Sequence, residues 1–434
     1  MGVIKPQLVS GVKSVANTYG DILLKAWKMT SDAKSSNPEK EDYIISQEIM
    51  EDLIQEFLHD AIHASDPKYF KSLRGLLDSF HSNKNSKGVD AMMLKIYDPI
   101  IWRSLQCANA IVRAQSCALF LDVFPLNDPK SNTADDESLK QKQFDFIIML
   151  LKDQDHRVRM VVTSGICHVF KEYWGYIPVS ALKQILQYLV CTLSHDVSSP
   201  AVRASVFTGL GEILLNPLSH EILKTLLPLL ANSLHDTSEK VRLAFIKMLI
   251  QVKSIETIKF YEIVSEENLL LRFSVDSRKS NITTALTELL FNSYFPIQDK
   301  ESTTYNPAEE KAEQIRRCLI FIKKQSNAAC AFYSKLHLFS SVGTVARFSA
   351  LLFSYLLDKD SGILLSECSM NDENENENEE NNKNRQHPLM LRAKRRRTKE
   401  VILLPYLYSL YIYIYIYSIT LGYNLFRFVK QKMF

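Results

Sequence analysis

The sequence predicts an all-α protein built as a solenoid of stacked helix hairpins, and three observations support this fold class. The 434 residues include only 12 Gly and 14 Pro, too few turn residues for the connections of a β-sandwich or a doubly wound sheet. Apolar residues recur at helical spacing over most of the chain. A short motif also returns at an interval of about 40 residues, as repeated helical units do.

The composition sets broad limits on function. With 46% hydrophobic residues, the chain can bury a sizeable core. A formal net charge of +3 is too small to indicate a nucleic-acid or membrane partner, so any such partner must be argued from local patches. The seven cysteines are scattered without a CxxC motif, and we expect them to be buried thiols in a reducing compartment.

The repeated motif is a Val-Arg pair followed by an amphipathic stripe. In three of the four copies an aspartate precedes the arginine by six or seven residues, at the end of an apolar helix: Asp153, Asp196 and Asp236. The spacings between copies are 46, 44 and 39 residues, for pairs at Val112-Arg113, Val158-Arg159, Val202-Arg203 and Val241-Arg242. This period is typical of HEAT or armadillo repeats, in which each hairpin buries its apolar face against its neighbours.

One repeat illustrates the expected hairpin. Helix A should run through Leu223, Leu226, Leu227 and Leu230, and residues 236–238 should supply the turn and the N-cap of helix B. The stripe of helix B should comprise Val241, Ala244, Phe245, Met248, Leu249 and Val252. The preceding repeat places Val202, Ser205, Val206, Gly209, Leu210 and Ile213 in the same frame.

The turn aspartates and helix B arginines should form a ladder of charge pairs between stacked turns. We interpret this ladder as structural rather than as a ligand site, because its members recur with the repeat. It comprises Asp153, Asp196 and Asp236 with Arg159, Arg203 and Arg242.

Some segments are more specific than a general helical repeat: residues 97–105 (YDPIIWRSL), 109–113 (NAIVR), 124–129 (FPLNDP), 233–242 (SLHDTSEKVR) and 290–296 (LFNSYFP). They resemble the non-SMC HEAT-repeat subunits of the G type in the condensin II complex, over roughly residues 10–345. The resemblance implies a non-catalytic scaffold that binds the kleisin subunit and DNA, with SMC ATPases as further partners, in mitotic chromosome condensation in the nucleus. Because members of that family are longer at both ends, we expect a truncated or wrongly assembled form.

No enzyme signature accompanies the repeats, and we predict no catalytic, metal or cofactor site. The motifs GxxxxGK[ST], GxSxG and HExxH are absent from the sequence. Gly209-Leu210-Gly211 is better explained by close helix packing than by phosphate binding. His59 and His63 share a helix face but lack a third ligand, and His195-Asp196 and His235-Asp236 occupy repeated turns without a nucleophile.

DNA contact would require cations along one surface, because phosphate neutralisation supplies most sequence-independent affinity. Lys240 and Lys247 are seven residues apart and so share a helix face. Ala201 and Thr208 occupy the equivalent positions one repeat earlier, which interrupts the stripe, and a solvated helix face is an open alternative for each lysine. The candidate set is Arg157, Lys183, Lys224, Lys240, Lys247, Lys253 and Lys259.

The composition changes near residue 365. We expect a start of the solenoid over 1–97, HEAT repeats over 98–300, further helices over 301–365, a disordered acidic then basic linker over 366–400, and an apolar low-complexity tail over 401–434. Residues 371–380 (NDENENENEE) contain no apolar side chain and cannot offset the entropy of ordering. A basic cluster is a candidate nuclear localisation signal, formed by Lys394, Arg395, Arg396, Arg397 and Lys399.

The tail has two interpretations. Residues 401–426 carry no charge and are long enough to span a bilayer. Their centre, however, alternates Tyr and Ile from Tyr411 to Tyr417, as a translated TA dinucleotide repeat would. We therefore favour an artefactual tail over a membrane anchor, and we expect no membrane partner.

Two other functions remain open at this stage. A HEAT adaptor of the transport or phosphatase type would bind peptides on its concave face and ignore DNA. A membrane-tethered HEAT protein would use residues 401–426 as its anchor.

Overall fold

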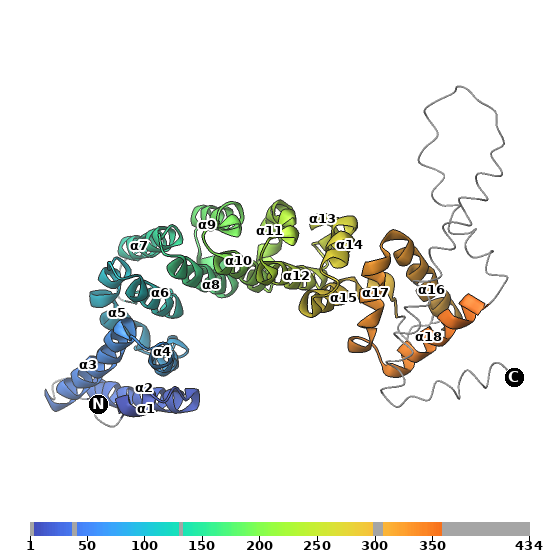
Figure 1. The fold of residues 1–434 in the computed structure, drawn as a ribbon. Helices are drawn as coiled ribbons and strands as arrows, with labels where there is room; N and C mark the ends of the chain where they lie inside the picture. The colour runs from blue at the N-terminus through green and yellow to red at the C-terminus, as the bar shows by residue number, and fades with distance from the viewer. Residues whose placement is uncertain (1–3, 37–40, 130–132, 298–306, 358–434) are drawn as a thin grey trace, which may run out of the picture. The chain divides into compact units, whose positions relative to one another are not determined.

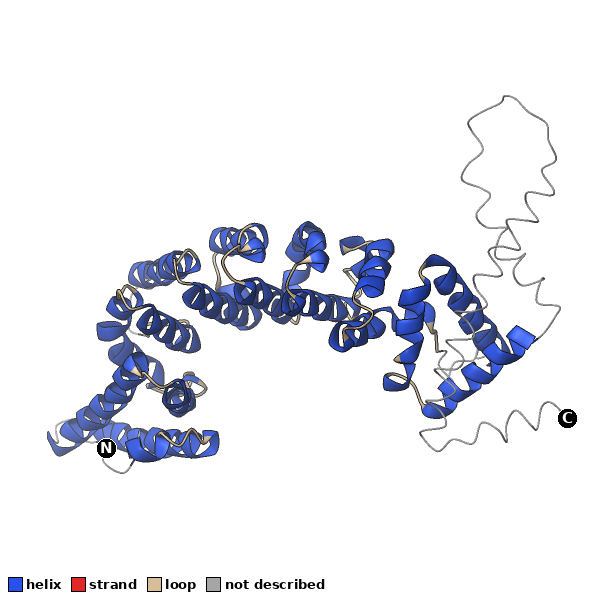
Figure 2. Ribbon diagram, viewed as in Figure 1, coloured by secondary structure: helices blue, strands red, loops and turns tan. Residues whose placement is uncertain are grey.

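The structure is a computed structural model that describes residues 4–36, 41–129, 133–297 and 307–357. Within these ranges every regular element is a helix, as Figures 1 and 2 show, and the all-α HEAT-repeat fold is confirmed. The chain separates into two compact units, Met1–Ser233 and Leu234–Phe434. The domain boundaries expected at residues 97, 300 and 365 stay predictions.

The first unit consists of α-helices joined by short turns and single 3₁₀ turns. Its elements are α1 (Ile4–Leu8), α2 (Lys13–Ser36), α3 (Glu41–His63), α4 (Pro67–His81), α5 (Val89–Leu105), α6 (Ala110–Val123), α7 (Thr133–Leu151), α8 (His156–Tyr173), η1 (Trp174–Tyr176), α9 (Val179–Cys191), η2 (Leu193–His195), α10 (Pro200–Ile213), η3 (Pro217–Ser219) and α11 (His220–Leu226).

The second unit follows a 3₁₀ segment, η4 (Leu227–His235), that crosses the division between the units. Its elements are α12 (Glu239–Lys253), α13 (Phe260–Ile263), α14 (Glu266–Val275), α15 (Ser280–Tyr294), α16 (Pro307–Lys324), α17 (Ser326–Ser334), η5 (Leu336–Leu338) and α18 (Val342–Leu357).

The repeated Val-Arg pair lies near the start of α6, α8, α10 and α12, which are the B helices. In the first unit α8 packs directly on both α6 and α10, while α7 and α9 form a second row (Figure 1). Capping residues define where these B helices begin. The side chains of Asn109, Asp155 and Ser199 each accept a hydrogen bond from the backbone N–H two residues later.

The predicted apolar stripes face the core. All six stripe residues of α10 are buried. In α12 five of six are buried; Ala244 is half-buried, and Ile246 is buried in addition. Ser238 occupies the N-cap position of α12 as expected, but its side chain makes no capping hydrogen bond. The Ser238 N–H instead donates to Asp236 Oδ1 at 2.7 Å, so the aspartate organises this turn.

The helix A predicted around Leu223 is only partly α-helical. It begins as α11 and tightens after Leu226 into the 3₁₀ segment η4. Pro228 accounts for this change, because proline has no N–H to donate within an α-helix and its ring clashes with the preceding turn. Leu223, Leu227 and Leu230 are nevertheless buried, so the core pattern survives.

The expectation that the cysteines are buried is wrong at Cys191, and Cys107 and Cys330 are only half-buried. Cys117, Cys167 and Cys318 are buried, but Cys191 is exposed at the last residue of α9. The described cysteines are all free thiols.

The C-terminal features all lie outside the described residues. These are Cys368, the acidic run 371–380, the basic cluster 394–399 and the apolar segment 401–426. Among the helices that the structure describes, none combines the length and apolar character needed to cross a bilayer.

Gly209 lies where α10 approaches α8 too closely for a side chain. A Cβ atom at this position would lie 2.4 Å from Cys167 Sγ and 2.8 Å from Cys167 Cβ. Both residues are buried, so the Cys167 side chain cannot move into solvent to make room. Helix packing therefore requires glycine here, in agreement with the structural interpretation of Gly209-Leu210-Gly211.

We predict that Gly209→Ala lowers the free energy of unfolding by about 1–3 kcal/mol, because the added methyl group overpacks the α8–α10 contact. Gly175→Ala is the control, since a Cβ atom there meets no heavy atom within 4 Å; it should change stability by no more than about 0.5 kcal/mol. Urea unfolding measures both. Equal stability of the two variants would contradict the packing argument.

Candidate functional site

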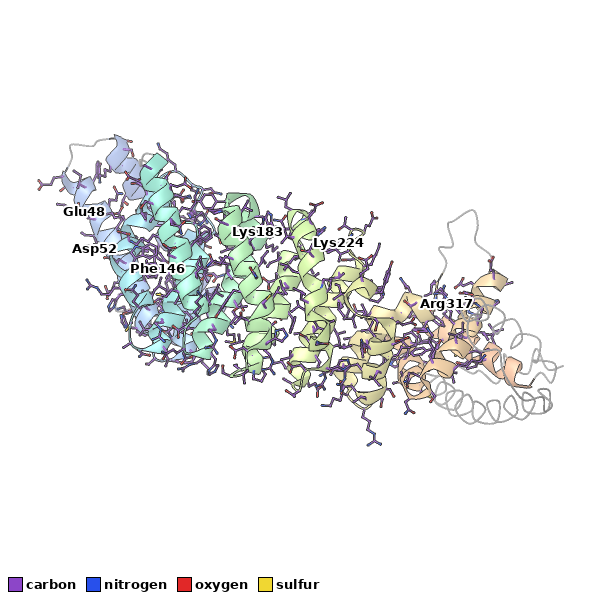
Figure 3. The ribbon with its side chains drawn as sticks, turned by 90° about the horizontal axis from the view of Figure 1, so that it is seen from above. Glu48, Asp52, Phe146, Lys183, Lys224 and Arg317 are labelled. Atoms are coloured by element: carbon purple, nitrogen blue, oxygen red, sulfur yellow. The ribbon has the colours of Figure 1, made fainter. Side chains whose placement is uncertain are left out.

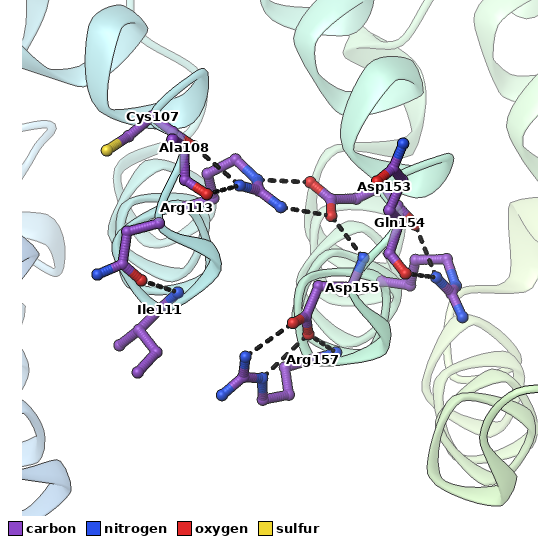
Figure 4. Close-up of polar contacts among 10 residues, drawn as sticks. Cys107, Ala108, Ile111, Arg113, Asp153, Gln154, Asp155 and Arg157 are labelled. Carbon is purple, nitrogen blue, oxygen red and sulfur yellow. Dashed lines mark hydrogen bonds and ion pairs between the residues drawn. The ribbon is translucent and has the colours of Figure 1, made fainter.

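A repeated arginine clamp holds successive turns of the solenoid together. Arg113 donates from Nε to Asp153 Oδ2 at 2.7 Å and from Nη2 to Asp153 Oδ1 at 2.8 Å. Its Nη1 donates to the backbone carbonyl oxygens of Cys107 and Ala108, at 2.8 and 2.9 Å (Figure 4). One guanidinium thus binds both the turn before its own helix and the turn of the next repeat.

The next arginine in the first unit repeats this geometry. Arg159 donates from Nε to Asp196 Oδ2 at 2.8 Å, and from Nη1 to the carbonyl oxygens of Asp153 and Gln154 at 2.6 and 2.9 Å. Arg203 donates from Nη1 to the Asp196 carbonyl oxygen at 2.7 Å. Each arginine therefore closes its own turn in the same way.

The second unit contains one more clamp. Arg242 donates from Nε and Nη2 to the two carboxylate oxygens of Asp276, at 2.9 and 3.1 Å. Its Nη1 donates to the carbonyl oxygens of Asp236 and Thr237. With side-chain exposures of 6% and 3% for Arg242 and Asp276, this ion pair is almost fully enclosed.

Sequence reasoning missed two members of the ladder, Arg113 and Asp276. Arg113 belongs to the first Val-Arg pair, and the interval from each arginine to its aspartate was an available signal. That interval is 40 residues from Arg113, 37 from Arg159 and 34 from Arg242. The pairing register is therefore arginine to the aspartate of the following repeat.

The ladder aspartates have a second role within their own turns. Asp153 Oδ1 accepts the Asp155 N–H at 2.8 Å, and Asp196 Oδ1 accepts the Ser198 N–H at 2.9 Å. Burial acts to raise the pKa of Asp153, but hydrogen bonds from Arg113 and the Asp155 N–H outweigh it, and its pKa lies below 3.8. For Asp196 burial is likewise outweighed, by hydrogen bonds from Ser198 and Arg159, and its pKa is lowered.

The seven DNA-contact candidates divide between the units. The first unit holds Arg157, Lys183 and Lys224; the second holds Lys240, Lys247, Lys253 and Lys259. Lys183 and Lys224 are exposed on α9 and α11, where Figure 3 labels them. Lys240 and Lys247 are exposed on α12, and Lys259 is exposed just before α13.

Two candidates are already engaged within the protein. Arg157 forms a two-pronged contact with the carboxylate of Asp155, at 2.7 and 3.0 Å, which offsets its charge (Figure 4). Lys253 Nζ donates to the Glu288 carbonyl oxygen at 2.9 Å, and burial lowers the pKa of Lys253.

Among the described residues, the histidine candidates considered for metal binding or catalysis include His59, His63 and His195. The His59 and His63 rings lie 4.5 Å apart, yet the described part of the chain contains no group of three or more His, Cys, Asp or Glu side chains that could hold a metal ion. His195 Nδ1 lies 2.6 Å from the hydroxyl of its neighbour Ser194, which itself donates to the Val190 carbonyl oxygen. The contact between His195 and Ser194 lies within η2 and its flanking turn, so it is a local turn contact.

The stacked hairpins and their arginine clamps define a helical-repeat scaffold of the HEAT class. A sequence model of the family described as "Condensin II non structural maintenance of chromosomes subunit" matches residues 1–128. A Condensin-2 complex subunit G2 from Xenopus laevis is 37% identical over 334 residues, covering 76% of this chain. The Homo sapiens protein of that name is 35% identical over 349 residues, covering 80% of this chain.

The chain belongs to the condensin II non-SMC subunit family. It spans 27% of the length of the Xenopus relative and 28% of that of the human relative. A chain in the solved structure of the Pds5-Scc1 complex aligns with 14% identity and a TM-score of 0.39. The alignment covers 82% of this chain and 58% of that chain. A similarity at that level carries no functional argument.

We predict that Arg159→Ala lowers the free energy of unfolding by about 2–3 kcal/mol, because it removes the guanidinium that pairs with the buried Asp196 carboxylate and donates to two turn carbonyls. Arg157→Ala is the matched control: that arginine is exposed, so thermal stability should be nearly unchanged. Thermal and urea unfolding of both variants measure the difference. Equal losses would show that the clamp is not the stabilising contact.

A pH dependence follows from the lowered pKa values of Asp153 and Asp196. Since folding lowers both pKa values, their stabilisation is complete well above 3.8, the ordinary value, and is lost as the pH falls through the folded-state values. Urea unfolding between neutral and acidic pH should show this loss. The double variant Asp153→Asn/Asp196→Asn should have a shallower slope over the same window; an identical slope would contradict the assignment.

Proposed function

We propose that this chain is a non-catalytic scaffold segment of a condensin II complex, and that it binds the kleisin subunit and DNA. The observation that carries the proposal is the identity of 35% or more, over at least three quarters of the chain, to relatives named Condensin-2 complex subunit G2. In this proposal SMC ATPases of the complex perform the hydrolysis, and this chain contributes binding surfaces to chromosome condensation in mitotic nuclei.

The proposed location is the nucleus, on chromosomes. The basic cluster of residues 394–399 would serve as an import signal, and it lies outside the described residues. The apolar segment 401–426 lies there too, so no observation on the described helices favours a membrane tether.

DNA contact is proposed at the exposed lysines of the repeats. Lys183 and Lys224 lie on α9 and α11 in the first unit, and Lys240 and Lys247 lie on α12 in the second unit. Within the described residues none of these four ammonium groups has a carboxylate within 4.0 Å. Unpaired cations of this kind suit phosphate contacts that do not depend on base sequence.

We predict salt-dependent binding of duplex DNA by the full chain. Reversing two charges in Lys183→Glu/Lys224→Glu should weaken binding and reduce the slope of log K against log salt by about 1–2, because up to two phosphate contacts are lost. A matched reversal of two exposed lysines on α4, Lys68→Glu/Lys71→Glu, should change the slope much less. Fluorescence anisotropy over a salt series measures both.

The same titration separates the proposal from a peptide-binding adaptor. An adaptor without DNA binding predicts no measurable association and hence no salt slope. Equal effects of the two double variants would contradict the assignment of Lys183 and Lys224 while leaving DNA binding itself in place.

A further inference from the structure

A groove of about 290 Å³ lies between α7 and α9 in the first unit, and no clamp arginine or aspartate lines it. Both helices belong to the second row; the last turn of α7 and the C-terminal half of α9 supply the walls of the groove. The lining residues that matter for binding are Leu151, Lys152, Gln184, Ile185, Gln187 and Tyr188.

The groove combines an apolar floor with hydrogen-bonding walls. Leu151 and Ile185 are buried and form the base, whereas Gln184, Gln187 and Thr192 are exposed. A volume of 290 Å³ falls just below the range of about 300–1,000 Å³ that is usual for small-molecule sites. The space is therefore better matched to one or two side chains of a bound peptide than to a cofactor.

The charge of the groove is positive. Lys152 is its only lysine or arginine, and no aspartate or glutamate lines it. The Lys152 ammonium lies 5.8 Å from the centroid of the Tyr188 ring and has no carboxylate partner within 4.0 Å in the described residues. The adjacent Asp153 is occupied by Arg113, and α9 contains no acidic residue at all.

We propose that this groove binds a short peptide segment of a partner protein, in which an apolar anchor residue has an acidic residue beside it. The anchor would pack on Leu151 and Ile185, and the carboxylate would pair with Lys152. The glutamine side chains would bind the peptide backbone. Because the C-terminal ends of α7 and α9 disfavour an anion, the lysine is needed to select it.

A peptide fits this surface better than DNA. A duplex presents evenly spaced phosphates and is held by rows of cations, whereas the groove offers one lysine over an apolar floor. The inference goes beyond the function proposed above, because it assigns a peptide class to a surface that the DNA argument does not use.

The test is selection of short random peptides displayed on phage against the full chain, followed by anisotropy measurements on one synthetic selected peptide. Two variants alter exposed lining positions: Lys152→Glu reverses the charge, and Gln187→Trp fills the groove. The control is Lys71→Glu, a charge reversal of an exposed lysine on α4 of the same unit. Unchanged thermal unfolding of all three variants verifies that they fold.

The proposal predicts that selected peptides combine an acidic residue with a nearby large apolar residue. Their Kd should rise at least about tenfold in both groove variants, and by less than about twofold in the control. Failure to select any peptide, or equal binding by all three variants, would overturn it. So would loss of duplex DNA binding, rather than peptide binding, in Lys152→Glu. Failure of DNA binding or of complex assembly by the unaltered chain would overturn the proposed function and leave this result intact.

Discussion

The arginine near the start of α6, α8 and α12 binds two successive turns at once, and the spacing of these hairpins depends on this contact. Arg113 and Arg159 each donate to carbonyl oxygens of their own turn and to an aspartate of the next repeat. Desolvating such an ion pair is costly, and the cost is offset only where hydrogen bonds satisfy the whole group. Here the partner carboxylates also accept turn N–H groups, so each clamp fixes the local backbone and the register between neighbours together.

Close packing of the B helices in the first unit positions the second row of helices, which carries the groove and two of the lysines proposed for DNA contact. Gly209 lets α10 approach Cys167 of α8, and the apolar stripe of α10 is buried. The second-row helices α7 and α9 are then held a fixed distance apart, with the groove between them. The lysines proposed for DNA and the lysine of the groove lie on elements whose positions the clamped B helices set.

The sequence predicted the repeat and its amphipathic faces because both are local patterns. The Val-Arg period correctly located the starts of α6, α8, α10 and α12, and the α10 stripe is buried in full. Register was harder to predict: a turn aspartate could serve the arginine of its own repeat or that of the previous one, and Asp276 lacks the Val-Arg context of the others. Pro228 could have signalled the 3₁₀ segment η4.

The site was less predictable than the fold. Lys152 and Tyr188 are far apart in the sequence, and only the distance between α7 and α9 reveals that they share a groove. Lysines that look alike in the sequence also differ in the structure: Lys253 is engaged by a backbone carbonyl, whereas Lys247 is exposed. The burial of a lysine and its hydrogen-bond partners depend on packing between repeats, which cannot be predicted from the sequence pattern of one helix.

Affinity purification of the endogenous protein from dividing cells, followed by mass spectrometry, tests the central claim most directly. The account predicts that two SMC ATPases and a kleisin are recovered with this chain, in amounts comparable to it. Recovery of soluble, intact chain without these partners would contradict the proposed role as a scaffold of a condensin II complex.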